Sequence, residues 1–189
     1  MSFRRVVLLA AALVATAAFT GCAVKASNYQ PSIANVTALK NGGTKSIALG
    51  EFTVQSGAIG GASITLRTSS MSPPDTTDYA GYIANALKAE LDLAKRLDPK
   101  SDIQISGVLM KNDIAAGGIS RNSGEIQARF VVRRNGKVGF DKTERVTDDW
   151  ESSFAAAIAI PKAQQQYPSL VQKLLGALYS DADFQAAIR

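Results

Sequence analysis

Residues 124–140 read GEIQARFVVRRNGKVGF and carry the clearest hairpin pattern in the chain. Every second side chain from Ile126 to Val132 is apolar, which predicts a strand over 124–134 with one buried and one solvent-facing side. Asn135-Gly136 favours a type I′ turn, because both residues tolerate a positive φ. The chain is therefore expected to return antiparallel from Lys137 to about Trp150.

The segments upstream of this hairpin supply further strands. Asp102 to Lys111 alternates in the same way and predicts another half-buried strand. Lys45 to Val54 is short, rich in apolar residues and bounded by glycines, which is typical of a first strand. Ser63 to Thr68 could pair back on it as an additional strand that ends before Pro73-Pro74.

Two helices are expected to accompany these strands. Apolar residues recur at helical spacing from Tyr79 to Ala94, and Thr76 or Thr77 is the expected N-cap. The second helix is indicated by the apolar stripe from Leu170 to Leu178. The resulting order, β(β)αβββα, favours an α+β two-layer sandwich, in which an antiparallel or mixed sheet of four to five strands carries both main helices on one face.

Prolines and polar residues define the ends of the second helix. Pro161 suits a first helical turn, and Pro168 is expected to kink the start of the helix. Ser180 or Asp181 then caps a final helical turn that runs through Ile188.

The N-terminal residues have the pattern of a bacterial export signal. Arg4 and Arg5 precede an apolar run that is too short to span a bilayer comfortably. The run ends in Phe19-Thr20-Gly21-Cys22, which resembles the lipobox of bacterial lipoproteins. The resemblance implies that residues 1–21 are a signal peptide and that Cys22 is acylated. An ordinary secretory signal followed by a free thiol is the alternative.

Acylation would fix the protein to a membrane, because each buried methylene contributes about 0.8 kcal/mol and two or more chains hold stably. Ala23 follows the cysteine where an aspartate would mark retention in the inner membrane, so the resemblance implies the periplasmic leaflet of the outer membrane. Residues 22–43 contain few large apolar side chains and are expected to be the lipidated cysteine and a tether, which Tyr29, Ile33 and Val36 could dock in part on the domain. Residues 44–189 are expected to form one α+β domain.

Composition excludes several kinds of chemistry. The 189 residues include no histidine and a single cysteine, which excludes histidine-based catalytic triads, intramolecular disulfides and the usual zinc sites. The net charge of +5 falls to +3 when Arg4 and Arg5 leave with the signal peptide. This balance is not that of a nucleic-acid-binding protein. No catalytic residue, metal or cofactor is expected.

The best candidates for an enzymatic site are the acidic residues beside Trp150. Asp148, Asp149 and Glu151 could in principle act on a glycan held against the indole. Alternatively, they cap backbone N–H groups between a strand and a helix, and Trp150 seals the edge of the core.

A basic cluster on the hairpin is the candidate partner-binding site. Alternation places Arg129 and Arg133 on the polar face of the sheet, and Arg134 and Trp150 complete the expected set. Such a surface could hold an envelope protein, an anionic lipid or a glycan. The alternative is a solvated face on which Glu125 and Glu144 pair with the arginines across the strands.

One further apolar stretch lies between the hairpin and the last helix. Ala155 to Ile160, beside Phe154, is far below the length that spans a bilayer. It is expected to be core or a docking surface.

In its lipobox and in the order of its expected elements, the chain resembles small proteobacterial envelope lipoproteins of the YajG-like type. More distantly, it resembles auxiliary lipoproteins of ABC-type transporters and lipopolysaccharide-assembly lipoproteins. The resemblance is one of layout, and only Cys22 transfers residue for residue. It implies a non-catalytic accessory factor in envelope transport or maintenance; a periplasmic glycan-cleaving enzyme and a purely structural envelope lipoprotein are the alternatives.

Overall fold

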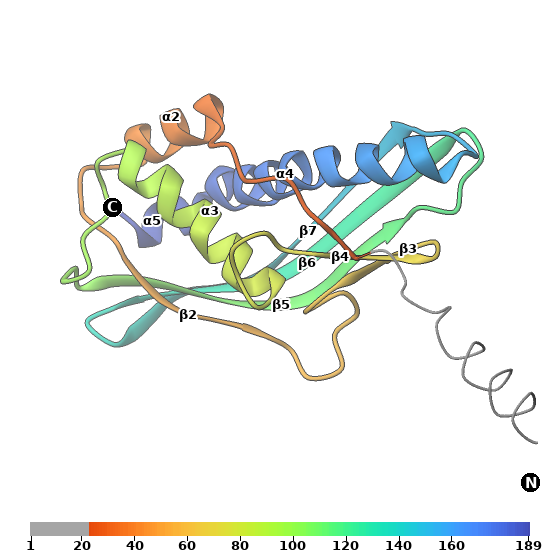
Figure 1. Cartoon of the computed structure of the whole chain (residues 1–189). Helices are drawn as coiled ribbons and strands as arrows, with labels where there is room; N and C mark the ends of the chain where they lie inside the picture. The colour runs from red at the N-terminus through yellow and green to blue at the C-terminus, as the bar shows by residue number, and fades with distance from the viewer. Residues whose placement is uncertain (1–22) are drawn as a thin grey trace, which may run out of the picture.

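A computed structural model describes residues 23–189, which fold into a four-stranded sheet with helices on one face (Figure 1). The strand order is β2-β5-β6-β7. β2 pairs with β5 in parallel, and the other two pairs are antiparallel. These strands are β2 (Ala48–Val54), β5 (Ile103–Ala115), β6 (Arg121–Arg134) and β7 (Lys137–Glu151).

The predicted hairpin forms between β6 and β7. Asn135 and Gly136 have φ angles of 50° and 78°, as a type I′ turn requires. Arg134 and Lys137 face each other next to the turn. The alternating apolar residues of β6 are buried, because their side of the sheet is the one that the helices cover.

The helical layer consists of α3 (Tyr79–Leu93), α4 (Ala156–Ser180) and α5 (Ala182–Ala187), with α2 (Ile33–Asn41) lying across α3 and α4 (Figure 1). Asp78, rather than a threonine, caps α3 by accepting from the Gly81 amide at 2.8 Å. α4 begins five residues before Pro161, so this proline lies beyond the first turn. Asp181 caps α5, one of the two caps that the sequence predicts.

The core lies between the sheet and the helices. The ring of Tyr167 in α4 packs at an angle against those of Tyr79 and Tyr82 in α3, with centroids 4.7 and 5.3 Å apart. Phe130 contributes from the centre of the sheet and is fully buried. Together these residues join the two layers of the predicted α+β sandwich, and the predicted fold class is confirmed.

A second sheet of three strands shows that the predicted pairing of residues 63–68 with the first strand is wrong. Its order is β1-β4-β3, formed by β1 (Ala23–Lys25), β4 (Ser69–Ser72) and β3 (Ile64–Leu66). The strand expected from Ser63 to Thr68 therefore exists as β3 but does not pair with β2. The left-handed residue Arg67, at a φ of 57°, turns the chain back so that β3 pairs with β4.

Residues 23–43 are docked on the domain and do not form a free tether: β1 pairs with β4, and α2 packs on α3 and α4. Asn35 of α2 donates to Glu90 Oε1 of α3 at 3.1 Å and to the Gln172 carbonyl of α4 at 3.0 Å. The Tyr29 hydroxyl donates to the same Glu90 oxygen at 2.6 Å. These polar contacts act together with apolar packing, because Leu39 is fully buried and Tyr29 and Val36 pack against the core.

Candidate functional site

Cys22 lies outside the described residues, which begin at Ala23 of β1. No helix between residues 23 and 189 is long and apolar enough to cross a bilayer. The surface around which a binding site can be built is the face of the four-stranded sheet opposite the helices, which we call the open face. Within the described part of the chain no helix covers it (Figure 1).

Arg129 lies on the open face, as predicted, and is bound to a neighbouring strand. Its guanidinium contacts both carboxylate oxygens of Asp141, at 2.6 and 2.5 Å. This bidentate contact lowers the pKa of Asp141 below its ordinary value. Because the pair is exposed to solvent, it sets the local arrangement of charge more than it stabilises the fold.

A second ion-pair network lies further along the same face. Glu125 accepts from Lys111 at 2.9 Å and from Arg145 at 2.8 Å. The hydrogen bond from Lys111 is the main cause of the lowered pKa of Glu125, and Arg145 adds to it. Glu125 is thus a cross-strand mate of basic residues, as the solvated-face alternative proposes. Glu144 is not, because alternation places it on the helix side opposite Ala128.

Arg133 differs from Lys111, Arg129 and Arg145, the open-face cations that form ion pairs. It takes part in none of the ion pairs formed by residues 23–189. It borders a depression of about 360 Å³, whose lining includes Glu51, Gln104 and Ser106. An exposed guanidinium beside such a hollow can donate hydrogen bonds to a carboxylate, phosphate or sulfate from outside.

The other two predicted binding residues do not lie on the open face. Arg134 points to the helix side, where it donates to the carbonyl oxygens of Ala187, at 3.2 Å, and Arg189. Trp150 is only 6% exposed and packs in the core. The predicted set is therefore split, because consecutive residues of a strand face opposite sides.

The acidic residues beside Trp150 are also divided between the two faces. Asp148 lies on the helix side and contacts Lys173 of α4 at 2.5 Å. Asp149 and Glu151 alternate with it and are exposed on the other side. All three belong to β7 and none caps a helix, but Asp148 Oδ1 accepts from the Asp149 amide at 3.0 Å, a backbone contact of the kind that the structural alternative expects. Trp150, in contrast, has the core position that this alternative assigns to it.

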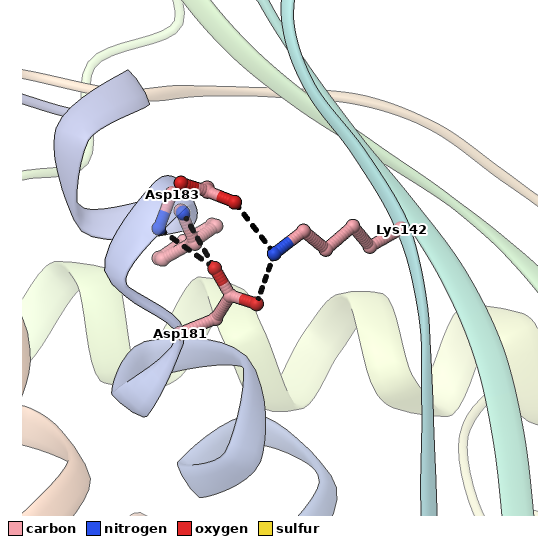
Figure 2. A network of polar contacts seen from close by, with 4 residues as sticks. Lys142, Asp181 and Asp183 are labelled. Carbon is pink, nitrogen blue, oxygen red and sulfur yellow. Dashed lines mark hydrogen bonds and ion pairs between the residues drawn. The ribbon is translucent and has the colours of Figure 1, made fainter.

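Figure 2 shows the polar network that fastens α5 to β7. Lys142 contacts Asp181 at 2.8 Å and Asp183 at 2.7 Å. The other Asp181 oxygen accepts from the Asp183 and Phe184 amides at 2.7 and 3.1 Å, which caps α5. These contacts raise the pKa of Lys142 and lower that of Asp181. The network therefore has a structural role at the end of the helical layer.

Three buried or half-buried polar residues, none of them a predicted site residue, form hydrogen bonds between segments that are distant in the sequence. Glu90 accepts a hydrogen bond from Tyr29 of the N-terminal segment. Arg96 donates to the carbonyl oxygens of Lys45, Leu39 and Ile188. Arg67 donates to four carbonyl oxygens in two loops. The position of Glu90 within the apolar stripe of its helix indicates from the sequence that this residue is buried. Nothing in the sequence around the two arginines indicates which carbonyls they bind, since those carbonyls are distant in the chain.

No protein-family model matches the chain, and no curated protein matches it. Protein XCC0632 from Xanthomonas campestris, of the family DUF330, has a similar structure, with a TM-score of 0.54 and 9% identity over 87% of this chain and 96% of that chain. A "putative lipoprotein" from Caulobacter crescentus CB15 aligns with a TM-score of 0.45 and 12% identity over 80% of this chain and 93% of that one. Hypothetical protein CT253 from Chlamydia trachomatis aligns with a TM-score of 0.41 and 8% identity over 77% and 98% of the two chains. At these identities the likeness to XCC0632 is one of fold alone.

Proposed function

We propose that this protein is a non-catalytic accessory factor of the bacterial envelope, similar to the YajG-like and transporter-auxiliary lipoproteins. Acylated Cys22 holds it in the periplasmic leaflet of the outer membrane. It binds another envelope component through the open face of the sheet. The observation that carries this proposal is the open face itself: a long sheet that the described helices cover on one side only (Figure 1).

The distribution of charge supports binding at one end of the open face. Arg129 and Glu125 already have partners in the folded protein, so an incoming ligand gains little from them. Arg133, like Arg121 at the other end of β6, has no ion-pair partner within residues 23–189, and it alone of the two borders the hollow, which polar and apolar residues line. An acidic segment of an envelope protein, placed across the hollow, would therefore make its new contacts at Arg133.

Site-specific crosslinking in cells tests the binding face. A photoreactive residue at Ser106, inside the hollow, is expected to capture a partner, and Arg133→Glu is expected to abolish the captured band. The matched control is a photoreactive residue at Lys88, which is exposed on α3 of the opposite layer. Equal capture from both positions, or capture that survives Arg133→Glu, would contradict the open face as the binding site.

The lipid anchor and the absence of catalysis have separate tests. The mass of the native protein should exceed that of the chain from Cys22 onward by its acyl groups, and Cys22→Ser should release the protein from membranes. The double variant Asp149→Ala with Glu151→Ala should retain the cellular function. An intact fold with abolished function in that variant would favour the glycan-cleaving alternative.

A further inference from the structure

One end of the molecule exposes large apolar side chains. Phe154 is 78% exposed, Ile119 is 74% exposed and Ile158 is 57% exposed. The five consecutive residues 154–158, Phe-Ala-Ala-Ala-Ile, are all exposed. A run of this kind on the surface of a folded domain indicates a contact surface. We call Ile119, Phe154 and Ile158 the apolar tip.

The two connections that carry the apolar tip are fastened to each other. The Ser152 amide donates to the Ser120 carbonyl at 2.7 Å. Arg67, in the turn between β3 and β4, donates to the carbonyls of Ala116 and Ser153, both at 2.7 Å. Because one guanidinium bonds to both connections, Ile119 and Phe154 are held at the same end of the molecule, where the first turn of α4 carries Ile158.

The chain enters the domain at this same end. Ala23 begins β1, which pairs with β4 next to the β3–β4 turn. The Gln164 side chain donates to the Lys25 carbonyl at 2.5 Å, and further along the Gln172 side chain donates to the Gln30 carbonyl at 2.6 Å. The N-terminal segment therefore runs alongside α4 in the same direction. Its start lies near the start of α4, which carries part of the apolar tip and lies at the same end as β3 (Figure 1).

The composition of this end suits contact with lipid. Residues 114–120, IAAGGIS, and 152–161, SSFAAAIAIP, contain no charged side chain. Charged groups resist transfer from water into a bilayer interface, whereas phenylalanine and isoleucine gain free energy from it. The two connections carry no charge of their own, and the Arg67 guanidinium at this end is occupied by their carbonyls. An apolar surface of this kind, at the end where the chain begins next to Cys22, is placed against the membrane by the lipid anchor.

We propose that the apolar tip lies in the boundary between headgroups and acyl chains of the membrane that holds Cys22; this inference rests on the lipid anchor of the proposed function. Because residues 23–43 are bound to α3 and α4, the domain is held upright on the membrane and does not swing on a tether. β6 has 14 residues, so the far hairpin stands about 45 Å from the tip, at about 3.3 Å per residue. The open face then lies along the membrane normal and is accessible to a partner.

Fluorescence quenching by nitroxide-labelled lipids tests this orientation. The full-length processed protein is reconstituted in vesicles of phosphatidylethanolamine and phosphatidylglycerol, with an environment-sensitive fluorophore on Phe154→Cys. The matched control is Val138→Cys, which is 54% exposed at the opposite hairpin. Both sites are exposed, so both variants are expected to melt as the parent does. The parent, whose only cysteine is Cys22, serves as the labelling blank.

Acyl-chain nitroxides are expected to quench the label at position 154 several-fold more than the label at position 138, and Ile119→Cys and Ile158→Cys should behave like Phe154→Cys. Equal quenching at 154 and 138, or none at either in a membrane-bound protein, overturns the membrane contact but leaves the anchor standing. In that case a protein partner covers the tip. Labelling of the parent at Cys22 shows a free thiol and overturns the anchor together with this inference.

Discussion

Removing the Glu90 carboxyl group should detach the N-terminal segment from the helices. Glu90 is fully buried, and its Oε1 accepts from the Tyr29 hydroxyl, the Ser32 amide and the Asn35 side chain at 2.6, 3.0 and 3.1 Å. Burial and the hydrogen bond to Glu90 raise the pKa of Tyr29, so its hydroxyl stays a donor throughout the physiological range. Glu90→Ala leaves all three donors without this acceptor.

The magnitude follows from the number of donors. A buried hydrogen bond contributes about 1 kcal/mol net, so Glu90→Ala should lower the free energy of unfolding by about 3 kcal/mol. For a domain of this size, that corresponds to a fall in Tm of about 6 to 12 °C. Tyr29→Phe removes a single donor and should cost about 1 kcal/mol. Glu90→Gln keeps an oxygen acceptor and should cost less than Glu90→Ala.

Thermal unfolding followed by circular dichroism measures these shifts, and hydrogen exchange locates them. In Glu90→Ala the amides of α2 should exchange faster, whereas those of β5 and β6 keep their protection under native conditions. The reasoning is refuted if Glu90→Ala melts within about 2 °C of the parent, or if α2 stays as protected as it is in the parent.

Two further predictions concern a turn and an ion pair. Gly60→Ala should destabilise the protein far more than Gly57→Ala: both glycines have positive φ, but a Cβ at Gly60 would lie 1.6 Å from the Asn112 carbonyl oxygen, whereas nothing lies within 4 Å at Gly57. Urea unfolding measures the difference, and equal losses would count against the close approach. The lowered pKa of Glu125 means that its contribution is present above its ordinary pKa of 4.5 and is lost as the pH falls through the lower value of the folded state. Glu125→Gln should therefore lose less stability than the parent between about pH 6 and about pH 3, and parallel pH profiles would contradict this.

The sequence predicts the strands and main helices because their signals are local. Alternation from Ile126 to Val132 and the Asn135-Gly136 turn require only neighbouring residues, and the structure confirms the hairpin. Alternation also placed Arg129 and Arg133 correctly on the polar face. Because successive residues of a strand face opposite sides, the same rule places Arg134 on the helix side, and alternation alone therefore excludes Arg134 from a binding site on the polar face.

The remaining features depend on residues that are distant in the chain. Nothing near Asn35 indicates that its acceptors are Glu90 and Gln172, so a segment poor in large apolar residues had the pattern of a tether. The pairing partner of β3 was likewise ambiguous, because a strand of three residues carries little register information.

By itself, the sequence predicted an export signal, a candidate lipid anchor at Cys22 and the α+β class, since each prediction follows from composition or short-range patterns; the structure confirms the class. Only the tertiary structure decided that residues 23–43 are docked, that Trp150 is buried, and that Ile119 and Phe154 share one end of the molecule. The physical reason is that hydrogen bonds and packing contacts between distant segments form only when the complete fold brings those segments together. No local pattern encodes which donor will meet which acceptor.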